Sequence, residues 1–310
     1  MRTMRRTAAL LGAAVLLAGL GTATASAAKL GKPATANPKI QSICSLDLGS
    51  ITANGNYVDQ VVSAASPPVA SERRVGPQIA QPGETRASAT WEFKPEPEGG
   101  SSDSGYALYG DTLYSTVINN VPGGPWWGRG LAMEDMSAYT SIARAAYPKG
   151  DSPTRQYFYA LRNDGSLVRW KLDKEGFHPL GTHAGFSAVK TMTLISTTST
   201  YDTFLATTRG GALYTIRLPL TSPMKPVVKM VRSSTWQAFD ALIAEKCGQY
   251  GTLLLGIDKD TKSGYLYAIG HANGPATVIQ GLGKVLATFA DPTYFRHTAE
   301  PGTAPLLFGE

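Results

Sequence analysis

The chain has 310 residues, of which 43% are hydrophobic and 17% charged, and they include 14 tyrosines and 5 tryptophans. Low charge with this many aromatic residues indicates a folded globular protein. A chain of this length can bury enough surface to fold without stabilising disulfide bonds or metal ions. Two cysteines exclude a disulfide-dense scaffold and a zinc site built from four cysteines. The formal net charge of +6 would suggest nucleic-acid binding, but part of it lies at the very start of the chain.

Residues 1–27 have the order of a cleaved secretory signal peptide. Arg2, Arg5 and Arg6 precede an apolar run over residues 8–20, and small residues ending in Ala25-Ser26-Ala27 follow. A membrane anchor is the alternative, but it would need roughly 20 apolar residues to cross a bilayer. We therefore expect cleavage after Ala27, a secreted, extracellular protein and no membrane span.

Loss of the signal peptide changes the charge argument. Removing three arginines leaves 26 basic and 23 acidic residues, and the longest remaining basic run is Arg73-Arg74. This excludes the electrostatic footprint of a nucleic-acid-binding protein. Residues 28–40 are expected to form a flexible leader, followed by one domain over residues 41–310.

Secretion also bears on Cys44 and Cys247. Two cysteines in an oxidising compartment most simply pair with each other, the alternative being two separate thiols. Farther along the chain, residues 63–104 are rich in proline, serine, glycine and charge, so we expect an irregular, insert-like region there.

A loop over residues 121–130 contains two adjacent tryptophans among prolines and glycines. Neighbouring side chains of an extended chain point in opposite directions, so Trp126 and Trp127 cannot both be buried easily. Exposed tryptophan beside arginine is typical of binding surfaces, which makes Trp126, Trp127 and Arg129 candidate ligand-binding residues. The alternative is that one tryptophan packs beneath the loop while the other covers a sheet edge.

A fifty-residue repeat organises the rest of the chain. A pattern of apolar, polar, alanine and apolar residues begins at Met136 and recurs at Phe186 and Trp236, with a weaker copy at Leu286. Periods of 40–50 residues are typical of propellers or helical arrays. Between the copies, short β-rich runs flank glycine turns, as at Gly165, and such turns indicate hairpins. The repeat therefore predicts strands.

The predicted fold is an all-β propeller, with five four-stranded blades and a range of four to six left open. Its last copy, at residues 286–289 and 304–308, lacks one outer strand. We expect the N-terminal region, at residues 43–48 or 57–62, to supply that strand and close the ring. The pairing of Cys44 with Cys247 would then fasten the closure.

No common catalytic motif is present. The four histidines, His178, His183, His271 and His297, do not have metal-ligand spacing, and the acidic loop from Asp258 reads as a hairpin turn rather than a calcium loop. We therefore predict no metal, no cofactor and no enzymatic activity.

Several repeat motifs resemble those of the tachylectin-type five-bladed propellers. They are Gly185-Phe186-Ser187-Ala188-Val189, Trp236-Gln237-Ala238-Phe239 and the turns at Gly211-Ala212-Leu213-Tyr214 and Gly264-Tyr265-Leu266-Tyr267. The resemblance covers roughly residues 105–310 and implies binding of N-acetylated aminosugars between blades. The matching residues pack the blades, so they assign no sugar contacts.

Three hypotheses for the function follow. The first is a secreted lectin-like protein that binds carbohydrate in grooves between blades or on loops. The second is a propeller that binds another extracellular protein. The third is a hydrolase or lyase whose residues meet at the central channel, because such a site leaves no local motif.

Overall fold

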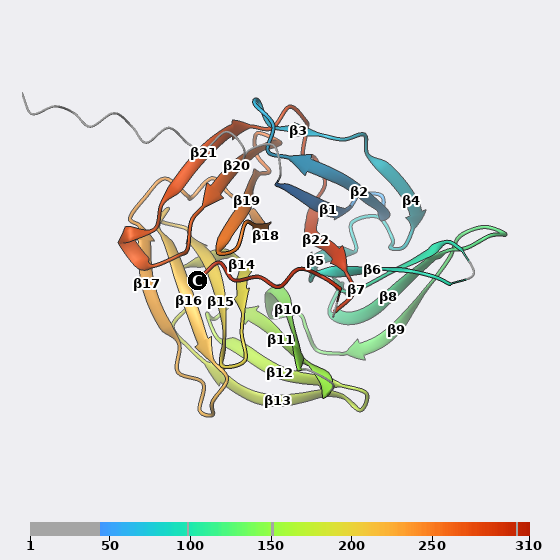
Figure 1. Ribbon diagram of the computed structural model, residues 1–310. Coiled ribbons are helices and arrows are strands. Elements are labelled where there is room, and N and C mark those ends of the chain that lie inside the picture. Colours follow the sequence, from blue (N-terminus) through green and yellow to red (C-terminus); the bar gives the residue numbers. More distant parts are fainter. Residues whose placement is uncertain (1–43, 98, 150–151, 302) are drawn as a thin grey trace, which may run out of the picture. The chain divides into compact units, whose positions relative to one another are not determined.

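The computed structural model describes residues 44–97, 99–149, 152–301 and 303–310 (Figure 1). The chain divides into two units, residues 1–36 and 37–310, and the first lies entirely outside the described residues. The expected signal peptide at 1–27 and leader at 28–40 therefore fall outside the described part and stay predictions. Among the described residues, no helix is long and apolar enough to cross a membrane.

Three antiparallel four-stranded sheets follow one another in the second half of the chain. Their first strands begin at Tyr139, Val189 and Ala241, close to the predicted fifty-residue period. In chain order the strands are β10 (Tyr139–Lys149), β11 (Ser152–Arg162), β12 (Leu167–Asp173), β13 (Gly176–His183), β14 (Val189–Thr197), β15 (Tyr201–Thr208), β16 (Leu213–Pro219), β17 (Val227–Arg232), β18 (Ala241–Cys247), β19 (Gly251–Asp258), β20 (Ser263–Ile269) and β21 (Ile279–Lys284).

A ten-stranded sheet contains the remaining strands. These are β1 (Ser45–Ile51), β2 (Asn56–Ser63), β3 (Val69–Ala70), β4 (Arg74–Gln78), β5 (Thr85–Ser88), β6 (Trp91–Pro95), β7 (Ser101–Tyr109), β8 (Thr112–Asn120), β9 (Trp126–Met133) and β22 (Thr293–Ala299). β22 pairs antiparallel with β1 and parallel with β6. The described part thus has four separate sheets, and five blades result only if this sheet is divided at the β22–β6 pair.

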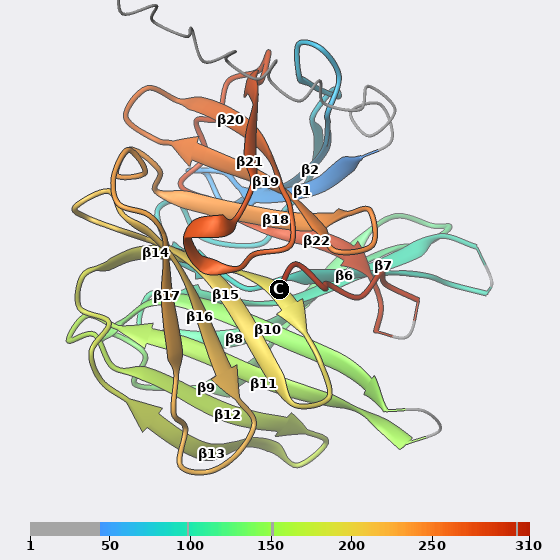
Figure 2. The ribbon, with the colours of Figure 1, turned by 60° about the vertical axis from the view of Figure 1, so that its left-hand side comes forward.

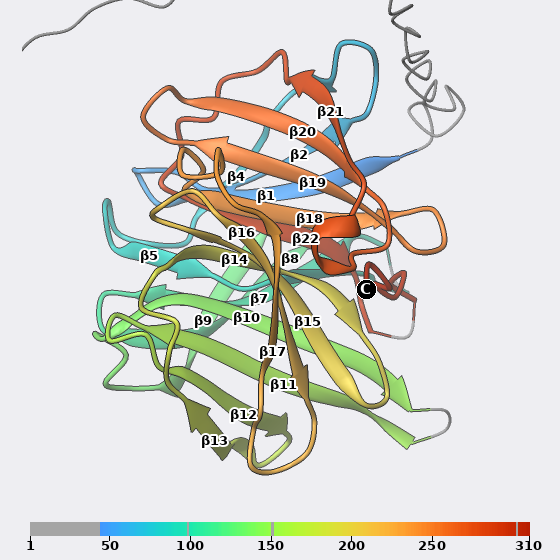
Figure 3. The ribbon, with the colours of Figure 1, turned by 90° about the vertical axis from the view of Figure 1, so that its left-hand side faces the viewer.

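The sheets form a β-propeller. β10 packs against β5 and β14, β14 against β18, β18 against β22, and β22 against β5, which closes a ring of neighbouring inner strands. Figure 1 looks into this ring and Figure 3 shows the sheets from the side. The all-β propeller expected from the repeat is confirmed.

Ring closure differs in detail from the expectation. The last strand is β22, whereas residues 286–289 and 304–308 form no strands and make only isolated bridges, Leu286 with Val69 and Phe308 with Ser196. The N-terminal region does close the ring, but it supplies β1 and the strands beyond it rather than one outer strand. The physical reason is that β22 lies between β1 and β6 and buries five of its seven residues, whereas Leu286 of the decayed repeat copy is exposed.

Residues 63–104 contain four strands, β3 to β6, where an irregular region was expected. These strands are short, between two and five residues, and they are interrupted by prolines and glycines. The composition of this region therefore indicated loops. The segments are extended because they pair with the longer strands β2 and β7, which supply their backbone hydrogen bonds.

The disulfide between Cys44 and Cys247 is confirmed. Cys44 directly precedes β1 and Cys247 ends β18, so the bond ties the sheet that holds the N-terminal strands to the preceding sheet. Both cysteines belong to the apolar cluster between these sheets.

The core lies between neighbouring sheets. The Tyr159 and Phe204 rings, from β11 and β15, meet edge to face with centroids 5.2 Å apart. Glycine permits the closest approaches, because a Cβ at Gly105 would collide with the Trp91 ring. Trp170 and Trp236 are buried, as expected of residues inside the repeat.

Candidate functional site

A groove with a volume of ≈ 290 Å³ lies between β2 and β4 on one side and β6 to β8 on the other. We call it the Tyr57 groove. Its lining residues are Tyr57, Asp59, Arg74, Val75, Gly76, Pro77, Phe93, Ser101, Asp103, Ile118, Asn120 and His297. They combine ring faces with carboxylates, an amide, an imidazole and a guanidinium, which is the chemistry that small polar ligands require.

A buried carboxylate and imidazole form the wall of this groove. His297 Nε2 lies 2.7 Å from Asp103 Oδ1, and Asn120 Nδ2 donates a 3.2 Å hydrogen bond to Asp103 Oδ2. Asp103 and His297 are only 4% and 8% exposed. A buried carboxylate is tolerated when donors satisfy it, and here donors from β22 and β8 do so.

Tyr57 supplies an unused donor. Its hydroxyl is buried and has no hydrogen-bond partner among the described residues. Burial, reinforced by the charges of Asp103 and Asp59, raises the pKa of Tyr57 well above its usual value, so the hydroxyl keeps its proton. A buried donor without a partner costs about 1–3 kcal/mol, and an acceptor on a ligand would recover this loss.

The rim of the Tyr57 groove is aromatic and charged. Phe93 is 38% exposed and meets the His297 ring edge to face at 6.3 Å. Arg74 donates two hydrogen bonds, of 2.7 and 2.9 Å, to the Asp59 carboxylate on β2. A flat apolar ring beside paired polar groups can stack on one face of a sugar and bond to its hydroxyls.

The strand register separates the two predicted tryptophans. Asp103 pairs with Ile118 across β7 and β8, and Ile118 pairs with Trp127 across β8 and β9. Directly paired residues share one face of a sheet, so Trp127 lies on the face that carries Asp103. Trp126 pairs with Asn119 and lies on the opposite face. The expectation that the two side chains point apart is met, and only Trp127 is on the groove side.

Arg129 is already engaged within the protein. Its guanidinium lies 4.6 Å from the Tyr109 ring centroid and 5.1 Å from that of Tyr114, and it pairs with Glu84 at 3.2 Å. The same guanidinium lies 5.8 Å from the Trp127 ring centroid. Arg129 is therefore engaged with neighbouring side chains rather than offering a free charge.

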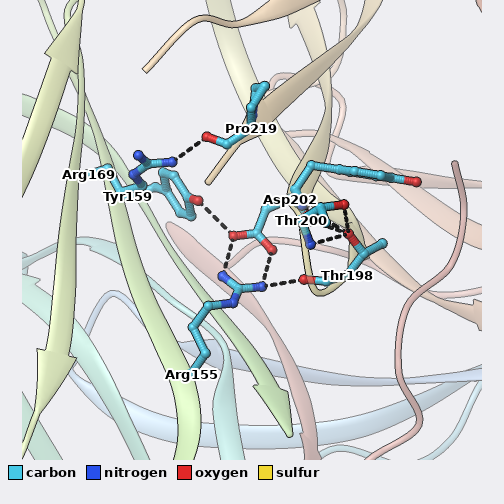
Figure 4. A network of polar contacts seen from close by, with 8 residues as sticks. Arg155, Tyr159, Arg169, Thr198, Thr200, Asp202 and Pro219 are labelled. Carbon is cyan, nitrogen blue, oxygen red and sulfur yellow. Dashed lines mark hydrogen bonds and ion pairs between the residues drawn. The ribbon is translucent and has the colours of Figure 1, made fainter. Parts of the chain in front are cut away.

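A second network joins two neighbouring sheets. Arg155 on β11 donates two 2.8 Å hydrogen bonds to the carboxylate of Asp202 on β15, and the Tyr159 hydroxyl donates a third at 2.7 Å (Figure 4). Asp202 is fully buried. With the Asp202 carboxylate satisfied, this network stabilises the sheet interface, while Arg155 Nε has no hydrogen-bond partner among the described residues.

The other sequence candidates lie apart from the Tyr57 groove. His178 lies 2.9 Å from Asp173 Oδ1 in the β12–β13 hairpin, with Glu175 nearby, whereas the His183 ring packs beside Phe186. The Lys171 ammonium, hydrogen-bonded to Asp173, lowers the pKa of that carboxyl. His178 and His183 thus share no site in the described structure.

The acidic loop behaves as a turn. Asp258 Oδ1 accepts hydrogen bonds from the backbone N–H groups of Asp260 and Thr261. Bonds of this kind close a tight turn. The hairpin interpretation of the sequence is thus consistent with the contacts in the structure.

The central channel has a volume of ≈ 150 Å³ and is lined mainly by residues of the inner strands. Its charged residues include Lys190 and Asp240, whose side chains pair at 2.8 Å. The buried His297–Asp103 pair lies in the Tyr57 groove and does not line this channel.

Sequence reasoning missed Tyr57, Asp103 and His297 as a group. Asp103 and His297 are 194 positions apart and belong to different repeat units. The expected closure of the ring indicated only that strands from the N-terminal region meet the last strands of the chain, and it named none of these three residues.

The comparisons with known proteins found matches only among solved structures. No family profile and no curated protein match the chain. Among solved structures it is similar to the fucose-specific lectin from Aleuria aurantia, with 11% identity, a TM-score of 0.46 and coverage of 84% of this chain and 86% of that one. The lectin SapL1, solved in complex with alpha methyl fucoside, has 11% identity, a TM-score of 0.38 and coverage of 80% and 99%.

A third similar structure is the WD40 domain of SCAP from fission yeast. It has 10% identity, a TM-score of 0.32 and coverage of 78% of this chain and 72% of that one. Identities this low transfer no ligand to the present chain.

Proposed function

We propose that this protein is a secreted, non-enzymatic carbohydrate-binding protein whose principal site is the Tyr57 groove. One observation carries the proposal: a buried unpartnered hydroxyl, a satisfied carboxylate and an exposed phenylalanine ring line a single groove between two strand sets. Sugars present apolar faces and closely spaced hydroxyls, and such a groove complements both.

Each residue has a separate role in this proposal. Phe93 stacks on the apolar face of the sugar, and Trp127 extends the stacking surface outward along β9. The Tyr57 hydroxyl donates to a ligand oxygen, while Asp103 and Asn120 bond the remaining hydroxyls. His297 fixes the Asp103 carboxylate in position through its 2.7 Å contact.

A glycan array probed with the secreted chain tests the proposal. N-acetylated aminosugars, implied by the tachylectin-type resemblance, and fucosylated glycans, which one similar lectin is named for, are the first probes. Phe93→Ala should weaken binding about tenfold or more through loss of stacking. Val278→Ala replaces another exposed apolar residue outside the groove and should leave affinity unchanged. A blank array, or equal effects of the two variants, would contradict the proposal.

The pair of His297 and Asp103 favours one second candidate, cleavage of the bound glycan by acid–base chemistry in the same groove. Mass spectrometry of array-positive oligosaccharides after incubation distinguishes the two functions. Intact oligosaccharides support binding alone, whereas shortened products that disappear with His297→Asn support the enzyme.

A further inference from the structure

The central channel carries an excess of positive charge. Of the described residues, four basic ones line it, Arg86, Lys190, Lys259 and Arg296, against one acid, Asp240. These residues come from successive parts of the ring, because β14, β18 and β22 follow one another around the channel, as Figure 2 shows. Their charges therefore act on one space of ≈ 150 Å³.

Carboxylates of the described structure balance part of this charge. Arg296 donates hydrogen bonds of 2.8 and 2.9 Å to the two carboxylate oxygens of Glu245. The Lys190 ammonium pairs with Asp240 Oδ1 at 2.8 Å, and the other oxygen of that carboxylate accepts from the backbone N–H of Lys259 at 2.9 Å. The positive charges of Arg296 and Lys190 thus each have an acidic partner, whereas those of the other two basic residues remain to be accounted for.

The Lys259 ammonium pairs with no carboxylate in the described part of the chain. It donates to the backbone carbonyl of Pro292, immediately before β22, which places the charge at the channel. An ammonium has three donors, so one backbone acceptor leaves two of them for a ligand. Desolvation lowers the pKa of Lys259 although part of the side chain stays exposed; Asp240 opposes this shift and the Lys190 ammonium adds to it. A lowered lysine pKa indicates a positive charge that lacks compensation.

Arg86 is held by backbone dipoles and, among the described residues, by no carboxylate. Its two terminal nitrogens donate to four backbone carbonyls over distances between 2.8 and 3.3 Å. These carbonyls belong to Gly110, Met136, Ser137 and Tyr139. The bonds fix the guanidinium at the channel wall and leave its full charge in place. Arg86 and Lys259 therefore give the channel two positive charges without acidic partners.

We propose that the central channel binds one small oxyanion: sulfate, phosphate or a carboxylate group. Its volume of ≈ 150 Å³ has room for several water molecules, and hence for an oxyanion that keeps part of its hydration. The Lys259 ammonium supplies charge-assisted hydrogen bonds, while Arg86 and Lys190 add attraction from the wall. The oxyanion is either a free ion or the acidic group of a saccharide, because both present the same oxygens. This site is separate from the Tyr57 groove, since the two share no lining residue.

Equilibrium dialysis of the unaltered chain with labelled sulfate at low ionic strength should show one bound ion per chain. Lys259→Met should weaken this binding about tenfold, because charge-assisted hydrogen bonds are lost. Lys174→Met makes the same change at a lysine whose side chain is 90% exposed in the β12–β13 hairpin, and it should leave sulfate binding unchanged. Asp240→Asn should instead tighten binding several-fold, because it removes the carboxylate that lines the channel.

A second measurement uses the unaltered chain alone. Sulfate should raise the midpoint of thermal unfolding in a saturable manner, since an ion that binds only the folded state stabilises it. Competition separates the two sources of the oxyanion. Displacement of labelled sulfate by glucuronate or glucose 6-sulfate at lower concentrations than inorganic phosphate requires would assign the site to an acidic saccharide, whereas displacement by phosphate alone would assign it to a free ion.

Three results would overturn the proposal: no bound sulfate, phosphate or glucuronate, displacement of sulfate by chloride at equal concentration, or equal losses in the two lysine variants. Phe93→Ala, which removes a ring from the Tyr57 groove, should leave sulfate binding unchanged. The oxyanion site and the proposed glycan site can therefore fail independently of each other.

Discussion

His297 Nε2 and Asp103 Oδ1 lie 2.7 Å apart although the two residues are separated by 194 positions. The contact exists because β22 and β7 lie on either side of β6 in one continuous sheet. Ring closure thus builds the wall of the proposed binding groove. The pairing of β22 with β6, which closes the ring, brings the His297 imidazole beside the Asp103 carboxylate.

Asp103→Asn tests this relationship. The amide leaves one acceptor oxygen for two donors, His297 and Asn120, so the variant should lower the free energy of unfolding by about 1–3 kcal/mol and weaken glycan binding. Urea denaturation and calorimetric titration measure the two effects. Asp59→Asn removes a carboxylate that pairs with the exposed Arg74, and its effect on stability should stay within about 1 kcal/mol. Similar stability losses in the two variants would argue against a special role for the buried pair.

The two adjacent tryptophans should behave differently. Trp127→Ala removes a ring on the Asp103 face of the sheet and should weaken glycan binding several-fold, whereas Trp126→Ala should leave affinity unchanged. Both rings are partly exposed, at 39% and 55%, so neither variant should unfold the domain. Affinity measurements with one array-positive glycan check the difference. Equal losses would place both rings at the ligand and exclude a site confined to one sheet face.

The Cys44–Cys247 disulfide should contribute substantially to stability. It closes a loop with a sequence separation of 203, for which the chain-entropy model gives about 5 kcal/mol as an upper figure. The Cys44→Ala, Cys247→Ala variant should therefore unfold at lower urea concentration than the unaltered chain. Adding reductant should lower the midpoint of the unaltered chain and not that of the variant. An unchanged midpoint would show that strand pairing alone holds the closure.

Alkaline pH should destabilise the protein partly through Tyr109. Burial raises the pKa of Tyr109 from 10.0 to about 12. The unfolded chain ionises at the lower value, so the contribution of Tyr109 is complete below pH 10 and is lost as the pH rises towards 12. The loss amounts to about 2–3 kcal/mol. Tyr109→Phe should flatten the pH dependence of unfolding in this window and leave it unchanged between pH 5 and 8.

Spectrophotometric titration checks the assignment directly. The difference between the unaltered chain and Tyr109→Phe should contain one tyrosine ionising near pH 12. Ionisation of that tyrosine near pH 10 would contradict the burial argument.

The sequence by itself determined the strand class and the fifty-residue spacing of the three regular sheets, and it favoured the pairing of Cys44 with Cys247 that the structure confirms. These features depend on local sequence or on composition. Glycine turns favour hairpins, and in a chain with only two cysteines each has one possible partner within the chain. It also predicted that the N-terminal region closes the ring, because the last repeat copy was incomplete.

Only the tertiary structure decided the site. Tyr57, Asp103 and His297 carry no common local motif, and their chemistry arises when strands from both ends of the chain enter one sheet. Register likewise decided that Trp127, and not Trp126, lies on the groove face, since the alternation of side chains becomes meaningful only once the paired strands are known. The ion pair between Arg217 and Glu310 has the same origin, because residues 93 positions apart in the sequence meet only in the closed ring.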